Sequence, residues 1–371
     1  MSEDQRLHVG IEGRAYDIVA GSGLLPRAAE LIQKVRAVKR LVVVTDETVA
    51  GLHLQSLHRS LEQAGIAHQD IVLPAGEGTK DFAHYAKLSE DILSLGIERG
   101  TLLVALGGGV VGDLTGFTAS TLLRGIDFVQ IPTTLLAQVD SSVGGKTGIN
   151  TPQGKNLVGA FHQPVLVLAD IDVLETLPRR DFLAGYAEVV KYGLIRDPGF
   201  FAWLEEQGAA LVRGDRSARL KAVVESCQAK ATVVEADERE TGERALLNFG
   251  HTFGHALEAE VGYSDELLHG EAVAIGMILA FDMSVRLGLC KPETAERVRR
   301  HFEAVGLPTR IATSQGRKFT TEALISHMYK DKKVKDGKLT FILARGIGEA
   351  FITREVALDD LRGLLDGALA S

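Results

Sequence analysis

Three histidines in the second half of the chain are the first residues whose types and spacing suggest chemistry. His251 and His255 are four residues apart, so on a helix both imidazoles project from one face, as in H-E-x-x-H metal sites, although Thr252 stands where that motif has its glutamate. His269 follows an amphipathic segment and opens a second helical run that could fold back on the first. The three imidazoles are therefore expected to converge. The alternative is that they are helix histidines satisfied by hydrogen bonds in the core or by solvent.

A carboxylate that could join these histidines lies upstream. Catalytic zinc usually has three protein ligands and one open position, and one of the ligands is often a carboxylate. The segment from Asp181 to Ile195 is expected to be a helix, which places Glu188 and Lys191 three residues apart on one side. This pair is either a surface salt bridge or a metal ligand beside a cation that contacts substrate.

The elements before these residues alternate between strand and helix. A β-hairpin is expected around Glu12, and after it the apolar runs and amphipathic runs follow one another, which is typical of a Rossmann-like parallel α/β sheet. The expected strands are Arg40 to Thr45, Gln69 to Leu73, Thr101 to Leu106, Asp127 to Ile131 and Val165 to Leu168, and the expected helices are Gly23 to Val35, Val49 to Ala64 and Phe82 to Leu95.

A glycine-rich turn follows the strand from Thr101 to Leu106. Gly107, Gly109 and Gly112 satisfy G-x-G-x-x-G between a strand and a helix, the context in which glycines let the backbone approach a pyrophosphate. A tight structural turn is the alternative. The string Gly145-Lys146-Thr147 is not a P-loop, because Asp140 occupies the position of the required glycine.

Two further segments have polar composition without helical period. Residues Gly154 to Pro164 are expected to form a functional loop, and Asp331-Lys332-Lys333 is expected in a late loop, where it is either functional or a solvated charge run. After residue 177 strand-like runs almost vanish until Leu339 to Leu343. We therefore expect two domains, an α/β domain over residues 1–177 and an α-helical domain over residues 178–371, with main helices Leu211 to Val234, Leu246 to Glu260, Gly270 to Leu287 and Pro292 to Val305.

Composition restricts the classes of function. The chain has 371 residues, of which 45% are hydrophobic and 24% charged, with a net charge of −8, which argues against a general nucleic-acid or anionic-membrane binder. Cys227 and Cys290 lack C-x-x-C spacing, so a disulfide framework or thiolate zinc site is not suggested and a reducing compartment is implied. No signal peptide or membrane span is evident, which predicts a cytoplasmic protein.

The chain resembles the 3-dehydroquinate synthases over almost its whole length. The resemblance rests on the strings Leu106 to Gly116, Gln138 to Pro164, Ala187 to Gly193, Asn248 to Glu258 and His269 to Met277. It implies an NAD-binding α/β domain, an α-helical metal domain, an active site in the cleft between them, and a homodimer. It also implies that Glu188, His251 and His269 ligate Zn²⁺ or Co²⁺, whereas His255 faces the substrate.

The resemblance assigns the remaining site residues position by position. NAD would be bound by Asp46, Thr48, Glu77, Lys80, Gly108, Gly109, Val110, Gly112, Asp113, Thr133, Thr134, Asp140, Lys146, Lys155 and Thr176. Substrate would be bound by Arg124, Lys146, Asn156, Lys191, Lys230, Arg244, Asn248, His255 and either Lys332 or Lys333. The implied catalytic residues are His255, Asn248, Lys146, Lys191 and Asp140.

The implied reaction converts 3-deoxy-D-arabino-heptulosonate 7-phosphate to 3-dehydroquinate and phosphate, in the shikimate pathway to aromatic amino acids. Such a substrate carries a carboxylate and a phosphate, which suits a local cluster of Arg and Lys in a protein of negative net charge. The alternatives are another sugar phosphate cyclase, a metal- and NAD-dependent polyol dehydrogenase, which would not need the cationic set, and a non-enzymatic nucleotide sensor, which would not need three histidines.

Overall fold

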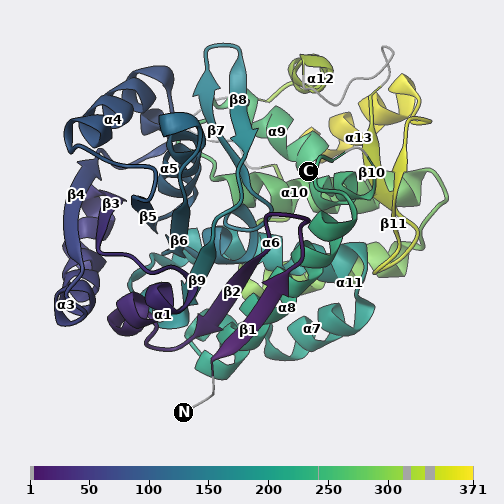
Figure 1. The fold of residues 1–371 in the computed structure, drawn as a ribbon. Coiled ribbons are helices and arrows are strands. Elements are labelled where there is room, and N and C mark those ends of the chain that lie inside the picture. The colour runs from purple at the N-terminus through teal and green to yellow at the C-terminus, as the bar shows by residue number, and fades with distance from the viewer. Residues whose placement is uncertain (1–3, 241, 312–318, 331–338, 371) are drawn as a thin grey trace. The chain divides into compact units, whose positions relative to one another are not determined.

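The computed structural model describes residues 4–240, 242–311, 319–330 and 339–370, and the chain divides into two compact units (Figure 1). The first unit comprises Met1–Pro178 and Arg219–Arg239, and the second comprises Arg179–Ala218 and Glu240–Ser371. The expected division after residue 177 differs from this one mainly in Arg219–Arg239. Most of helix α8 (Arg216–Ala236) belongs with the first unit, because the Cys227 Sγ–H donates to the carbonyl of Gln138 at 3.2 Å and Lys230 pairs with Asp140.

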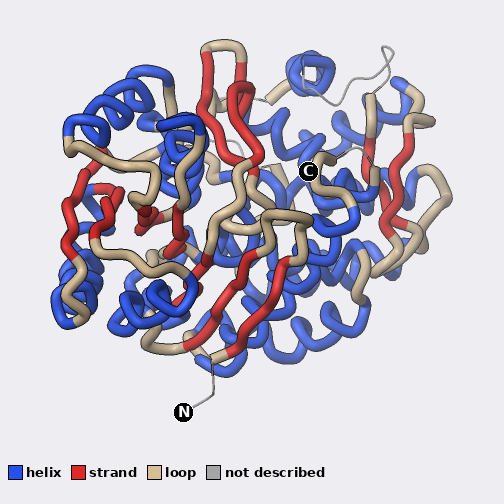
Figure 2. The backbone as a smooth tube through the Cα atoms, viewed as in Figure 1, coloured by secondary structure: helices blue, strands red, loops and turns tan. Residues whose placement is uncertain are grey.

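A seven-stranded sheet forms the centre of the first unit (Figure 2), which confirms the predicted α/β class. Its strand order is β1, β2, β9, β6, β5, β3, β4; β1 pairs antiparallel with β2, and every other neighbouring pair is parallel. The strands are β1 (Gln5–Val9), β2 (Tyr16–Gly21), β3 (Arg40–Asp46), β4 (Ala67–Leu73), β5 (Leu102–Gly107), β6 (Phe128–Pro132) and β9 (Leu166–Asp170).

Both faces of this sheet are buried. Along β3, Leu41 and Val43 belong to one hydrophobic cluster with α1 (Ala28–Val35) and α3 (Gln55–Gln63), whereas Val42 and Val44 belong to another with α4 (Phe82–Ser94) and α5 (Gly109–Thr121). Because side chains alternate across a strand, a strand that is covered on both faces is apolar at every position, which explains the continuous run that predicted it. Short helices complete the unit: η1 (Leu25–Arg27), α2 (Glu47–Val49), η2 (Ala50–Leu54), η3 (Glu77–Thr79), η4 (Leu122–Arg124), η5 (Ala137–Ser141) and η6 (Ile171–Thr176).

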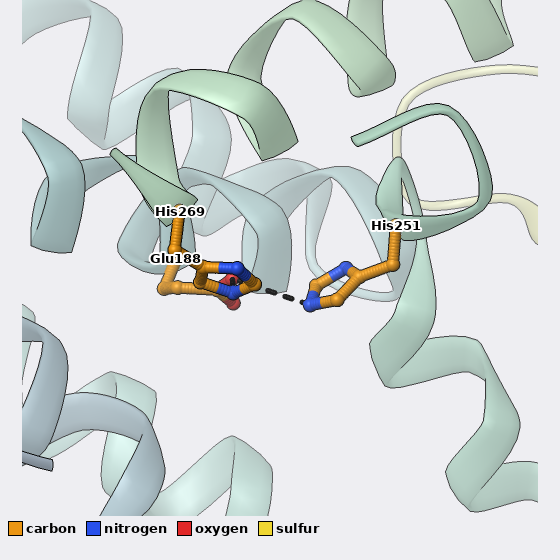
Figure 3. A group of neighbouring side chains, drawn as sticks. All are labelled: Glu188, His251 and His269. Carbon is orange, nitrogen blue, oxygen red and sulfur yellow. Dashed lines mark ion pairs between the residues drawn. The ribbon is translucent and has the colours of Figure 1, made fainter. Parts of the chain in front are cut away.

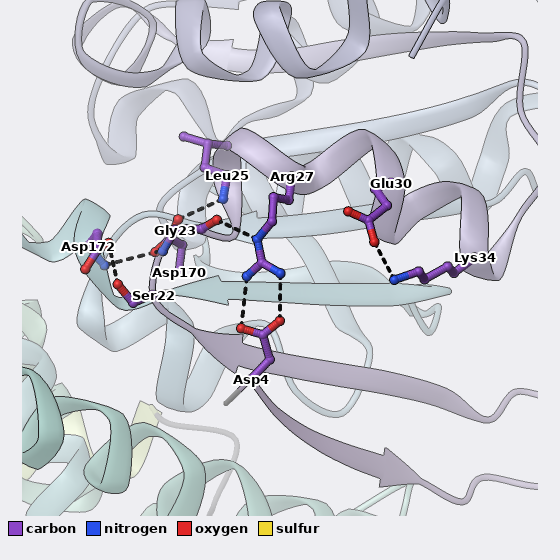
Figure 4. A network of polar contacts seen from close by, with 9 residues as sticks. All are labelled: Asp4, Ser22, Gly23, Leu25, Arg27, Glu30, Lys34, Asp170 and Asp172. Carbon is purple, nitrogen blue, oxygen red and sulfur yellow. Dashed lines mark hydrogen bonds and ion pairs between the residues drawn. The ribbon is translucent and has the colours of Figure 1, made fainter. Parts of the chain in front are cut away.

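The end of β9 is fixed to the start of the first helical segment by Asp170 (Figure 4). The buried Asp170 carboxylate accepts the backbone N–H groups of Leu25 at 2.7 Å, Gly23 at 3.1 Å and Asp172 at 3.0 Å. The Ser22 hydroxyl donates to Asp172 at 2.6 Å. Backbone donors that would otherwise lie unpaired next to the core are thereby satisfied.

Residues Gly154 to Pro164 are not the loop that the sequence predicted. Residues Gly154–Phe161 form strand β8, which pairs antiparallel with β7 (Lys146–Thr151). The two strands approach unusually closely, since a Cβ on Gly159 would lie 2.1 Å from the carbonyl oxygen of Thr147 and one on Gly148 would lie 2.7 Å from that of Val158. The glycines that indicated a loop therefore serve close backbone packing within a hairpin.

The second unit is predominantly helical, as predicted, with one small hairpin, β10 (Phe341–Ala344) and β11 (Ala350–Thr353). The helical run expected from Leu211 to Val234 is interrupted: Gly214 adopts a left-handed backbone (φ 108°) and ends the first of two helices. The helices are α6 (Arg179–Ile195), α7 (Pro198–Arg213), the start of α8, η7 (Glu243–Asn248), α9 (His251–Glu260), α10 (His269–Arg286), α11 (Pro292–Val305), α12 (Thr321–Lys330) and α13 (Leu358–Ala370). Among the described residues, no helix is both long and apolar enough to cross a membrane.

Glycines bring α6, α9 and α10 into backbone contact. A Cβ on Gly270, near the start of α10, would lie 1.9 Å from the carbonyl oxygen of Ala184 in α6. A Cβ on Gly276, two turns further on, would lie 2.0 Å from the carbonyl oxygen of Gly250, the residue before α9. Neither distance is compatible with any side chain larger than hydrogen. These two positions therefore determine how closely the three helices pack.

We expect Gly276→Ala to lower the free energy of unfolding by about 1–3 kcal/mol, because the methyl group forces α9 and α10 apart in a closely packed core. The measurement is the denaturant or thermal unfolding midpoint. Gly367→Ala in α13 is the matched control, since no atom lies within 4 Å of its added Cβ and an alanine favours the helix. Equal stability of the two variants would contradict the close-packing role of Gly276.

Candidate active site

Three potential metal ligands converge in the second unit, each from a different helix (Figure 3). Glu188 lies in the middle of α6, His251 is the first residue of α9, and His269 is the first residue of α10. Glu188 Oε1 is 3.6 Å from Nε2 of His251 and 3.6 Å from Nε2 of His269. The geometry thus brings together the residues that the family resemblance assigned to the metal, and the convergence of histidines that their spacing predicted is present.

Local structure fixes the directions of the two histidines. Gly250 has a left-handed backbone (φ 84°) immediately before His251, a conformation that costs little only for glycine. At the start of α10, the Glu271 carboxylate accepts the backbone N–H of Leu268 at 2.8 Å and forms a bidentate pair with Arg180 of α6 at 2.7 Å for each oxygen. The helix that begins at His269 is therefore held against the helix that carries Glu188.

In both histidines a hydrogen bond donated by Nδ1 leaves Nε2 as the nitrogen that faces Glu188. His251 Nδ1 lies 3.3 Å from the carbonyl oxygen of Phe249, and His269 Nδ1 lies 3.0 Å from Oε2 of Glu258. In each case an Nδ1–H donates to an oxygen, so Nε2 is the nitrogen that faces Glu188 and that carries the lone pair when the imidazole is neutral. Metal-binding histidines in proteins commonly have this arrangement.

The spacing of the three ligand atoms fits a divalent transition metal. Ligands at about 2.0–2.2 Å from a tetrahedral zinc ion lie about 3.3–3.6 Å from one another, whereas 3.6 Å is too long for a hydrogen bond. Glu188 is completely buried, and among the described residues neither of its carboxylate oxygens makes a hydrogen bond, although Lys191 contacts it. A buried carboxylate without hydrogen bonds is well suited to ligate a cation. Two imidazoles and one carboxylate leave further coordination positions for hydroxyl groups of a substrate.

The metal-free site attracts a proton in place of the metal. Burial lowers the pKa of the His269 imidazole, but the negative charge and hydrogen bond of Glu258 and the negative charge of Glu188 outweigh this effect and raise the pKa to about 10. His269 is therefore a cation at neutral pH in the metal-free protein. A divalent ion bound at Nε2 would have to displace that proton, which is the usual linkage between metal binding and proton release.

His255 lies beside this group. Its ring centroid is 5.3 Å from that of His251 and 6.1 Å from that of His269, and its ligand atom lies within 4.8 Å of those of Glu258 and His269. Its half-buried position next to the three ligands is compatible with a proton-transferring residue that faces a substrate.

Three of the residues assigned to substrate, Lys191, Arg244 and Asn248, belong to the same unit as the ligand group. Lys191 and Arg244 are almost completely buried, each 1% exposed. The Lys191 ammonium contacts the Glu188 carboxylate one helical turn away. The Asn248 amide donates to Glu240 at 2.6 Å. The pairing of Glu188 with Lys191, for which the sequence allowed a surface salt bridge, is therefore a buried contact.

Most of the residues assigned to NAD follow the carboxyl ends of the parallel strands of the first unit in the chain, whereas Lys146 and Lys155 lie on the β7–β8 hairpin. The chain runs from β3 outward to β4 and then returns to β5 on the other side of β3, so the strand order reverses between β3 and β5. Nucleotides bind at such a reversal in open α/β sheets. Asp46 ends β3, where its carboxylate accepts the N–H groups of Thr48 and Val49 at 2.9 Å each, and Gly107 ends β5.

The glycine-rich turn after β5 is closely packed. A Cβ on Gly107 would lie 2.7 Å from Val111, one on Gly112 would lie 2.8 Å from Gln130, and ones on Gly108 and Gly109 would lie 3.2 and 3.1 Å from Thr134 and Ser141. The structural interpretation of these glycines therefore has direct support. Helix α5 begins at Gly109 without a side-chain cap among the described residues, so its first N–H groups remain suited to a phosphate.

A polar network joins the turn after β4 to the β7–β8 hairpin. The buried Lys80 ammonium contacts Asp113 and donates to Asn156 at 2.6 Å. The Asn150 amide donates to Glu77 at 2.7 Å and accepts the backbone N–H of Asn156 at 3.0 Å. Residues assigned to NAD and to substrate are thus held together in the first unit. Asn150, which the sequence interpretation missed, connects them; its position inside β7, next to the segment expected to be a loop, gave no signal.

The remaining assigned residues of the first unit lie as follows. Lys230 pairs with Asp140, at 2.9 Å to its carboxylate and 2.7 Å to its carbonyl. Thr176 accepts from His53 at 2.9 Å and donates to the carbonyl of Val173. Thr133 is buried and Thr134 caps the following turn through Ala137, whereas Arg124 is exposed in a left-handed conformation (φ 68°). Val110 is the second residue of α5, and Lys146 and Lys155 lie on β7 and β8; Lys332 and Lys333 lie outside the described residues.

Two family models match this chain, and both describe the same family. Residues 70–184 match a family model described as 3-dehydroquinate synthase N-terminal, and residues 185–334 match one described as 3-dehydroquinate synthase C-terminal. A 3-dehydroquinate synthase of Rhodospirillum rubrum is 60% identical over 98% of this chain and 95% of its own length.

Two solved structures of related cyclases share the fold across nearly their whole length. A 2-epi-5-epi-valiolone synthase from Streptomyces hygroscopicus subsp. jinggangensis, with NAD⁺ and Zn²⁺ bound, has a TM-score of 0.87 and 30% identity and covers 96% of each chain. A 2-deoxy-scyllo-inosose synthase, complexed with carbaglucose-6-phosphate, NAD⁺ and Co²⁺, has a TM-score of 0.86 and 25% identity and covers 98% of this chain and 100% of its own.

The geometry predicts different effects for the neighbouring histidines of α9. We expect His251→Ala to lose stoichiometric Zn²⁺ or Co²⁺, because one of three ligands is removed, and His255→Ala to retain the metal while losing much of its activity. Metal content of the purified variants, measured by elemental analysis after dialysis, tests this. Metal-free His255→Ala together with fully loaded His269→Ala would show that the ligands are assigned wrongly.

Proposed function

The chain belongs to the 3-dehydroquinate synthase family, and we propose that it converts 3-deoxy-D-arabino-heptulosonate 7-phosphate to 3-dehydroquinate and phosphate. The observation that carries this proposal is 60% identity to a 3-dehydroquinate synthase over 98% of the chain, together with the group of Glu188, His251 and His269. Because the reaction eliminates phosphate from carbon, the enzyme would be a carbon–oxygen lyase of the shikimate pathway.

The buried cations support an anionic substrate over a neutral polyol. Lys191 and Arg244 are each 1% exposed and Lys230 is 6% exposed, although the protein as a whole has a net charge of −8. Lys191 and Lys230 pair with Glu188 and Asp140, and the concentration of such cations among the assigned substrate contacts, in a protein of negative net charge, suits a ligand with a carboxylate and a phosphate. Arginine can bind both oxygens of a carboxylate, and lysine contacts phosphate as a point charge.

Two groups supply chemistry that the side chains lack. The carboxyl ends of β3 and β5 would hold NAD, which would supply a reversible hydride acceptor, and Glu188, His251 and His269 would hold a divalent metal, which would supply a Lewis acid for substrate hydroxyl groups. Loss of a hydride from carbon and of the proton from its hydroxyl group would leave a ketone, which acidifies the adjacent C–H bond. The substrate's own phosphate would take up that C–H proton as the C–O bond to phosphate breaks.

The residues of the chain would bind and orient the substrate and would transfer protons. Lys191, Arg244 and Asn248, with Lys230, Arg124, Lys146 and Asn156, would hold the substrate, and His255 and Asn248 would stand near the proton transfers that accompany ring opening and aldol closure. Asp140 and Lys146 would lie where cofactor and substrate meet. The contact of Lys191 with Glu188 would place a cation beside the ligand set, where substrate oxygens bind.

The first test measures phosphate release and A340 together. We expect the purified enzyme with catalytic NAD to release one phosphate per heptulosonate phosphate while A340 stays flat, because each hydride removed is returned within the same turnover. A polyol dehydrogenase would instead accumulate NADH in proportion to product. Parallel assays with sedoheptulose 7-phosphate distinguish the cyclases, and equal or better turnover of that sugar would refute the proposed substrate.

A second test concerns recognition of the carboxylate. We expect Arg244→Ala to lower kcat/KM for heptulosonate phosphate roughly 10- to 150-fold, which corresponds to about 1.5–3 kcal/mol for a hydrogen bond to a charged group. Arg244→Lys should recover only part of this loss because the bidentate fork is absent. The exposed Arg213→Ala at the end of α7 serves as control.

The ratio of kcat/KM for heptulosonate phosphate to that for sedoheptulose 7-phosphate separates recognition from damage to the fold, since misfolding lowers both values equally. Arg244→Ala should reduce this ratio, because only the first substrate has the carboxylate. An unchanged ratio would show that Arg244 does not recognise the carboxylate.

A further inference from the structure

Glu258 is a buried carboxylate that none of the assigned functions uses. It lies on α9, seven residues after His251 and three after His255, so the three side chains share one face of the helix. Its exposure is 2%, and its Oε2 atom is 3.0 Å from Nδ1 of His269. From this contact we infer that Glu258 is a positioning residue, which fixes the tautomer and the orientation of the metal ligand His269.

The argument begins with the two nitrogens of the imidazole. A neutral histidine carries its hydrogen on Nδ1 or on Nε2, and only the other nitrogen can bind a metal. Glu258 accepts a hydrogen bond from Nδ1, which places the hydrogen there and leaves the lone pair on Nε2. That nitrogen lies 3.6 Å from Glu188 Oε1, on the side shared with His251. The same bond also holds the ring against rotation.

The two histidine ligands receive different support. His251 Nδ1 lies 3.3 Å from a backbone carbonyl, that of Phe249, whereas His269 Nδ1 lies 3.0 Å from a carboxylate. A hydrogen bond to an ionised acceptor is shorter and stronger than one to a neutral acceptor, and it increases the electron density on the opposite nitrogen. Glu258 therefore makes His269 the stronger donor of the pair, and its removal should weaken the metal site even though no direct ligand is lost.

A second glutamate on the same helix provides an internal comparison. Glu260 lies two residues beyond Glu258 and pairs with His327 at 2.8 Å, and both of these side chains are about one quarter exposed. A change from carboxylate to amide at Glu260 removes the same charge from the same helix as one at Glu258. The two positions differ in their histidine partner, His269 or His327, and in burial, since Glu258 is 2% exposed.

This inference rests on the proposed metal site, so the experiment measures metal binding and not turnover. Activity would be ambiguous, because the ligand atom of His255 also lies within 4.8 Å of that of Glu258. The full-length protein and its variants are stripped of metal, and Zn²⁺ and Co²⁺ are titrated against a competing chelator. The visible absorption bands of the Co²⁺ forms are recorded as a second readout.

We expect Glu258→Gln to weaken Zn²⁺ and Co²⁺ binding about 10-fold and Glu258→Leu to weaken it up to about 100-fold, the range found when such outer partners of ligands are removed. Glu258→Gln keeps the size of the side chain and an acceptor for Nδ1, so it carries the test where the leucine variant does not fold. Glu260→Gln should bind both metals as the unmodified protein does. The Co²⁺ bands should change in Glu258→Gln and not in Glu260→Gln.

Each outcome supports or overturns a definite statement. Unchanged affinity and unchanged Co²⁺ bands in Glu258→Gln, with loss of metal in His269→Ala, would overturn the role of Glu258 and leave the proposed ligands intact. Equal weakening in Glu258→Gln and Glu260→Gln would also overturn it, since the effect would then come from the charge of the helix. If the unmodified protein bound no stoichiometric metal, the metal site of the proposed function would itself be wrong.

Discussion

Close backbone contact among three helices is the constraint on which the candidate metal site depends. Each ligand lies on a different helix, and glycines bring these helices together: Gly270 meets α6 at Ala184, and Gly276 meets the residue before α9. Each contact lies within a few residues of a ligand, Gly270 beside His269 and Ala184 one turn before Glu188. Because a metal tolerates little variation in the distances between its ligands, the packing of backbones determines whether the side chains meet.

The nucleotide residues of the first unit depend on a different physical feature, the parallel sheet. The strand order reverses at the carboxyl ends of β3 and β5, where open α/β sheets bind nucleotides, and the glycines after β5 let α5 begin close to the strand. Side-chain contacts then connect the elements around these strand ends. Lys80 links the turn after β4 to α5 through Asp113 and to the β7–β8 hairpin through Asn156. The hairpin is therefore part of the framework that supports the assigned cofactor residues.

Features with a strong local period could be predicted from the sequence, and features set by close packing could not. The apolar run Arg40 to Thr45 predicted a buried strand because both sheet faces are covered, and the spacing of His251 and His255 predicted one helix face. The β7–β8 hairpin was missed because its glycines suggest a loop when strand pairing is unknown. Glu258 follows His255 by three residues, so the helical spacing that identified the histidines also contained it, but a lone glutamate on a helix is usually solvated.

The charges around His269 explain how one site can serve a metal and remain folded without it. The imidazole lies between Glu258 and Glu188, and in the metal-free protein its pKa rises from about 6.5 in the unfolded chain to about 10. A raised folded-state pKa contributes stability that is fully present below about pH 6.5 and is lost as pH rises through about 10. The proton thus compensates the buried carboxylates until a cation replaces it. Since a divalent ion must displace this proton, the same carboxylates that attract the metal also make its affinity increase with pH up to about 10.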